Sequence, residues 1–73
     1  MSGQLDKAIE RLKTVIRLQP TSLQAILLLA DTYERMGHKE DAAKAYRQAL
    51  PHVANPEIKK EIEKRVSDLK NNK

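Results

Sequence analysis

The sequence predicts an all-α fold in which four antiparallel helices form helix–turn–helix repeats, as in a short piece of an α-solenoid. Residues 3–8 align with residues 37–42, and the glycines that open the two segments are 34 positions apart. That distance is typical of solenoid units built from two helices. Apolar residues also recur at three- and four-residue spacing along most of the 73-residue chain, which indicates amphipathic helices.

The first two helices are expected over residues 4–18 and from about residue 22 to Met36. Pro20 ends the first helix, because proline lacks an amide donor and disfavours a helical residue before it. Thr21 or Ser22 caps the second helix, and Thr21 with Gln24 fits a capping box. Gly37 then ends this helix as a left-handed C-terminal residue.

The third helix is expected to begin near His38 or Lys39, with two acidic residues in its first turn. Pro51 either kinks its last turn or makes the helix end at Leu50. Asn55 and Pro56 predict the start of a fourth helix, as N-cap and first helical residue. One face of that helix carries four apolar residues: Ile58, Ile62, Val66 and Leu69.

The central segment resembles the tetratricopeptide repeat. Counted from Leu23, the matching positions are Ile26, Leu29, Ala30, Tyr33, Gly37, Ala42, Tyr46 and Ala49. Two features depart from the family pattern: Ile26 replaces the usual tryptophan or tyrosine, and the closing proline comes two residues late, at Pro56. The resemblance implies one domain over residues 1–73: a second-helix half-repeat (4–20), a complete repeat (21–55) and a capping helix (56–70).

Catalytic and metal chemistry is not expected. The chain has no cysteine, and His38 and His52 have no second ligand at metal-binding spacing. No serine lies near a candidate base, and the two glycines are isolated, so a phosphate-binding loop is absent from the sequence. We therefore expect no catalytic residue, no cofactor and no metal.

The charge pattern argues against nucleic acid as a partner. The 14 basic and 10 acidic side chains give a net charge of +4, but they are interleaved, as on solvated helix faces. Weak nucleic-acid binding through basic helix faces is the remote alternative. The sequence has no signal peptide or membrane-spanning segment, which slightly favours the cytoplasm, although a processed secreted product would look the same.

The family resemblance implies a scaffold that binds a peptide or partner protein in a concave groove. The corresponding groove positions are Gln24, Leu27, Asp31, Glu34 and Arg35, and Lys60, Glu63, Ser67 and Lys70 would flank them. Asp31 and Glu34 stand where the family's clamp for chaperone C-terminal carboxylates has Asn and Lys, and they would repel a carboxylate. The expected partner is apolar with basic flanks and contacts Leu27. Alternatively, Leu23 and Leu27 pack against a neighbouring helix.

Self-association is the main alternative. The first helix lacks the helix that would pair with it in a complete unit, which is expected if the chain is a piece of a longer array. Losing half the burial of its apolar stripe would cost roughly 3–6 kcal/mol. A homodimer could bury this stripe, which consists of Leu5, Ile9, Leu12 and Ile16.

Overall fold

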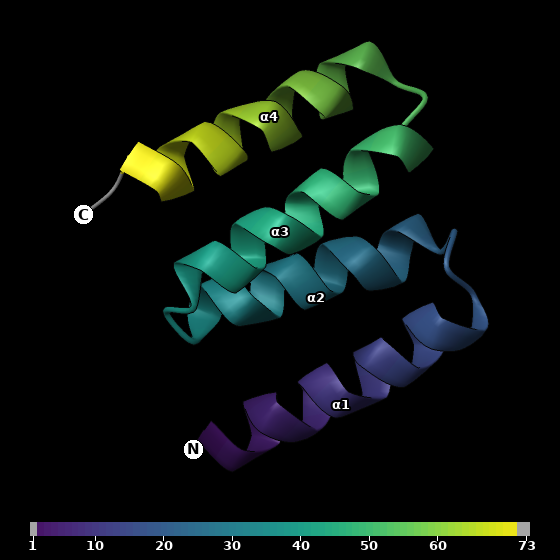
Figure 1. The fold of residues 1–73 in the computed structure, drawn as a ribbon, viewed down its shortest axis with the longest axis vertical. Coiled ribbons are helices and arrows are strands. Elements are labelled where there is room, and N and C mark those ends of the chain that lie inside the picture. The colour runs from purple at the N-terminus through teal and green to yellow at the C-terminus, as the bar shows by residue number, and fades with distance from the viewer. Residues whose placement is uncertain (1, 72–73) are drawn as a thin grey trace.

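The computed structural model describes residues 2–71 and confirms the all-α fold, with no strand in that range (Figure 1). Four α-helices follow one another: α1 (Ser2–Leu18), α2 (Leu23–Arg35), α3 (Lys39–Ala49) and α4 (Pro56–Asn71). A short 3₁₀ turn, η1 (Leu50–His52), separates α3 from the loop before α4.

Successive helices run antiparallel and pack side by side, as Figure 1 shows from α1 at the purple end to α4 at the yellow end. The central pair, α2 and α3, makes the most extensive contact, while α1 packs on α2 and α4 packs on α3. The result is a slab of 34 × 32 × 13 Å. Each helix therefore buries its apolar face mainly against its neighbours in the chain, as helices do in a solenoid.

The core depends on small residues at the helix contacts. Ala30 on α2 and Ala42 and Ala49 on α3 are fully buried, and side chains this small allow two helix axes to approach closely. Ile26 is the largest side chain with no exposed surface. The main cluster joins α2, α3 and α4 through Ala30, Ala42, Ala43, Ala45, Tyr46, Ile62 and Val66.

The turn between α2 and α3 depends on Gly37, whose φ of 80° confirms the predicted left-handed residue. The amide of His38 donates to the carbonyl of Tyr33 (2.9 Å), and the amide of Gly37 donates to the carbonyl of Glu34 (3.0 Å). These two bonds make a Schellman motif. The rings of Tyr33 and His38 stack with centroids 6.1 Å apart, so the side chains reinforce the turn.

We expect Gly37→Ala to destabilise the fold by about 1–2 kcal/mol, because an alanine Cβ is strained at this φ. Gly3→Ala is the matched control, since Gly3 lies in α1 and should gain up to about 1 kcal/mol from better helix propensity. A new Cβ would meet no atom within 4 Å at either position, so the comparison isolates the backbone effect. Thermal unfolding followed by circular dichroism measures both, and equal melting temperatures would contradict the prediction.

The helix caps confirm some expectations and correct others. Asn55 caps α4, with its Oδ1 accepting from the amide of Glu57 at 2.8 Å, as predicted. Ser22 caps α2 by accepting from the amide of Ala25 at 3.4 Å. The capping box of Thr21 with Gln24 was therefore wrong, because the N-cap is one residue later and the spacing no longer fits.

Two further details differ at the ends of α3 and α4. The third helix ends at Ala49, one residue earlier than expected, because the chain tightens into the 3₁₀ turn that contains Pro51. Ile58 is 42% exposed, whereas Ile62 and Val66 are buried. The first turn of α4 therefore extends beyond the contact with α3, and the predicted apolar face is used only from Ile62 onward.

Candidate protein-interaction site

A hollow of about 430 Å³ lies between α2 and α4. Both α2 and α4 pack against α3, so these two helices border the surface on which the hollow lies. Residues of α4 at one-turn spacing supply most of the lining, together with a single residue of α2. The lining residues are Glu34, Glu61, Lys64, Arg65, Asp68 and Leu69.

Glu34 links three helices at this hollow. The hydroxyl of Tyr46 on α3 donates to Glu34 Oε1 at 2.8 Å, and Arg65 Nη1 on α4 lies 3.5 Å from the same oxygen. The carboxylate is half-buried, so its bond to the hydroxyl is less exposed to competing water than a surface bond would be. The α2 end of the hollow is therefore lined by a carboxylate that contacts side chains of both α3 and α4.

The environment of Tyr46 changes the acidity of its hydroxyl. Burial raises the pKa of Tyr46 to about 12, and the hydrogen bond to the Glu34 carboxylate and its negative charge add to the effect. The charge that Tyr46 carries when ionised also raises the pKa of Arg65 above its ordinary value, and Glu34 contributes in the same direction. Below pH 10 the hydroxyl of Tyr46 is therefore neutral and can donate its hydrogen bond to the side chain of Glu34.

The groove residues expected from the sequence occupy different environments on α2. Gln24 and Arg35 are exposed, and Asp31 and Glu34 are half-buried. Arg35 Nε donates to Asp31 Oδ2 at 3.0 Å, so these two charges partly neutralise each other. Of the five residues, Glu34 lines the hollow with α4.

Leu27, the expected apolar contact for a partner, is half-buried and packs against the cluster formed by α2, α3 and α4. Packing against a neighbouring helix was one of the two alternatives that the sequence left open. Leu69 on α4 also packs on this cluster, but it lines the hollow as well. Leu69 is therefore the apolar side chain that a molecule in the hollow can contact.

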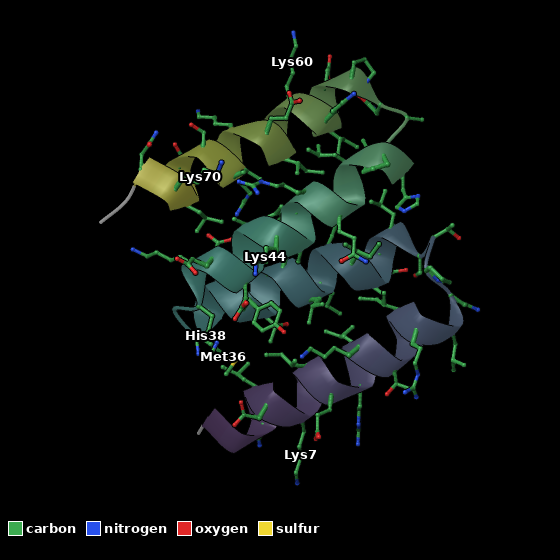
Figure 2. All side chains as sticks on the ribbon, viewed as in Figure 1. Lys7, Met36, His38, Lys44, Lys60 and Lys70 are labelled. Carbon is green, nitrogen blue, oxygen red and sulfur yellow. The ribbon has the colours of Figure 1, made fainter. Side chains whose placement is uncertain are left out.

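Four charged residues of α4 line the hollow although the sequence pattern did not indicate them: Glu61, Lys64, Arg65 and Asp68. The residues expected there, Lys60, Glu63, Ser67 and Lys70, are exposed but do not line it. Lys60 points outward from α4, away from α3 (Figure 2). The apolar pattern of α4 could have identified these lining residues, because the burial of Ile62 and Val66 determines which other side chains of this helix face α2.

The expected self-association stripe on α1 lies beside α2. Ile9 is 8% exposed, and Leu5, Leu12 and Ile16 are half-buried. The more exposed apolar residues of α1 are Val15 and Leu18. A homodimer through the stripe stays a prediction, and it would have to use the remaining exposed parts of these side chains.

Residues 2–71 contain no group of three or more histidine, cysteine, aspartate or glutamate side chains placed to hold a metal ion. Over the same range, no helix combines the length and the hydropathy needed to cross a membrane.

Antiparallel helix pairs that are joined by a tight turn, have small residues at their contacts and stack on one another define a helical-repeat protein. Residues 1–60 match a family model described as Tetratricopeptide repeat. The chain therefore belongs to the tetratricopeptide repeat family, as its sequence pattern indicated, and domains of this family generally serve as scaffolds for protein–protein interaction. Comparisons with curated proteins and with solved structures found no match.

Proposed function

We propose that this chain is a non-catalytic scaffold that binds a segment of a partner protein in the hollow between α2 and α4. The observation that carries the proposal is the composition of that hollow, where three carboxylates and two cations surround one accessible leucine. An apolar contact with polar groups around it is the usual composition of a peptide-binding surface.

The charges indicate what kind of segment fits. Glu34 is already engaged by Tyr46 and Arg65, whereas Glu61 and Asp68 form no ion pair with the residues that the structure describes. These two carboxylates are seven positions apart on α4, which is about 10 Å along the helix. A segment with an apolar side chain against Leu69 and basic side chains near both carboxylates would satisfy them. This partner agrees with the apolar, basic-flanked one expected from the sequence.

A short basic peptide tests the proposal. The probe has a central leucine with two lysines on each side, and nuclear magnetic resonance follows the backbone amides of the ¹⁵N-labelled chain. We expect the shifted amides to cluster on α2 and α4 around Leu69. We also expect Glu61→Gln with Asp68→Asn to weaken binding about tenfold, since both ionic contacts are lost.

Glu10→Gln with Glu63→Gln is the matched control, because it removes the same charge from exposed positions that do not line the hollow. The control should bind the basic peptide nearly as well as the unmodified chain. The proposal fails if both double variants bind equally well, or if the shifted amides lie on α1.

A further inference from the structure

A second groove lies on the other side of α4, between α3 and α4, with a volume of about 420 Å³. Ala43 and Leu69 form its apolar floor. Leu69 lines both this groove and the hollow, whereas its sequence neighbours Asp68 and Lys70 each line only one of them. Successive residues turn about 100° around a helix, so Asp68 and Lys70 point to opposite sides of Leu69.

The rim of this groove is strongly basic. Four of its lining side chains are cationic and one is acidic, and they come from both helices: Lys39, Glu40, Lys44, Arg47 and Lys70. Figure 2 shows Lys44 on α3 and Lys70 towards the C-terminal end of α4. Asp41 and Asp68 lie close to these residues in the sequence, but neither lines the groove. Asp41 lies 3.7 Å from His38 instead.

Helix packing in the repeat does not require this basic character. At the internal offset of 34 positions, Leu5 corresponds to Lys39 and Glu10 corresponds to Lys44. The first unit thus has an apolar and an acidic residue on α1 at the two positions where α3 has lysines. Arg47 corresponds to Lys13, which is also basic, so Lys39 and Lys44 are the α3 cations that are particular to this unit.

We propose that the α3–α4 groove binds a short acidic segment of a protein, with an aliphatic side chain on Ala43 and Leu69 and carboxylates around it. The charge of the rim complements such a segment, since Lys44, Arg47 and Lys70 can each pair with a carboxylate and the net positive charge favours the approach of an anion. Lys39 and Arg47 are eight positions apart on α3, about 12 Å, a span that four extended residues cover.

The lining also favours a peptide over nucleic acid. Single strands bind best where aromatic side chains stack with their bases, and no aromatic side chain lines this groove. Of the two tyrosines, Tyr46 is buried and Tyr33 stacks on His38. An apolar floor suits an aliphatic side chain, whereas a sugar-phosphate backbone would leave that floor without a partner.

The experiment uses a five-residue peptide with a central leucine and two acidic residues on each side, titrated into the ¹⁵N-labelled chain. We expect the shifted amides to lie on α3 and the end of α4, and binding to weaken as salt is raised. Lys44→Glu with Arg47→Glu should weaken binding about tenfold or more. Lys59→Glu with Lys60→Glu makes the same change of net charge at exposed positions outside the groove and should weaken it far less.

Three results would overturn the proposal: no shift with the acidic peptide, an equal loss in both double variants, or tighter binding of a ten-nucleotide oligothymidylate at the same amides. Circular dichroism shows that each variant is folded before it is titrated. The basic peptide that tests the α2–α4 hollow is run on the same samples, so failure at one groove is distinguishable from failure at the other.

Discussion

Ile26→Ala is expected to lower the free energy of unfolding by about 2–5 kcal/mol. Ile26 is the largest side chain with 0% exposure, so its removal loses apolar burial and leaves a cavity between helices. A chain of 73 residues has a typical total stability of about 4–11 kcal/mol. Urea unfolding followed by the helical circular dichroism signal measures the change, and a variant already unfolded in buffer represents the upper end of the range.

Leu28→Ala is the matched control for Ile26→Ala. Leu28 lies two residues later on α2 and is 50% exposed, so its truncation should cost less than about 1 kcal/mol. Both substitutions introduce alanine into the same helix, so helix propensity contributes little to the difference between them. Equal losses at the two positions would mean that α2 presents a different face to the core.

Tyr46→Ala should be about as severe, with an expected loss of about 3–5 kcal/mol. The side chain is 4% exposed and belongs to the cluster that joins α2, α3 and α4. Removing it opens a cavity and also removes the hydroxyl that donates to the half-buried carboxylate of Glu34. Urea unfolding measures this loss, and a change below about 1 kcal/mol would contradict the assigned burial.

Tyr46→Phe separates the ring from the hydroxyl. The ring and its packing remain, and only the bond to Glu34 is lost, so we expect a cost of about 1.5–3 kcal/mol, as for other hydrogen bonds to charged groups. If Tyr46→Phe were as unstable as Tyr46→Ala, the hydrogen bond rather than the packing would dominate. If it were as stable as the unmodified chain, the bond to Glu34 would make no net contribution.

The pH dependence of the folding stability tests the contact between Tyr46 and Glu34 independently of the substitutions. The pKa of Tyr46 is raised to about 12 in the folded chain, above its ordinary value near 10. Folding therefore favours the neutral hydroxyl, and the stability from this contact is complete below about pH 10 and is lost as the pH rises through 12. Ultraviolet absorbance should detect a tyrosine that ionises near pH 12 and is absent from Tyr46→Phe.

The helices and several of their ends could be predicted from the sequence because their signals are local. Gly37 ends α2 because of its own backbone freedom, and Asn55 caps α4 by bonding to amides two and three residues away. Such interactions depend on a few consecutive residues, so spacing in the sequence reveals them. The 34-residue offset predicted the repeat because neighbouring units pack through equivalent positions, and those positions therefore carry similar residues.

The lining of the two grooves depended on contacts between residues that are far apart in the sequence. Glu34 meets Arg65 across 31 positions and Tyr46 across 12. Which charged residues of α4 face α2 follows from the rotation of that helix about its axis, and the burial of Ile62 and Val66 determines that rotation. A change of one residue in register turns a helix by about 100°, enough to replace Lys60 and Glu63 by Glu61 and Lys64 at the hollow. The sequence by itself therefore determined the helices, the turn and the family, whereas only the packing of α4 on α3 decided which side chains form each groove.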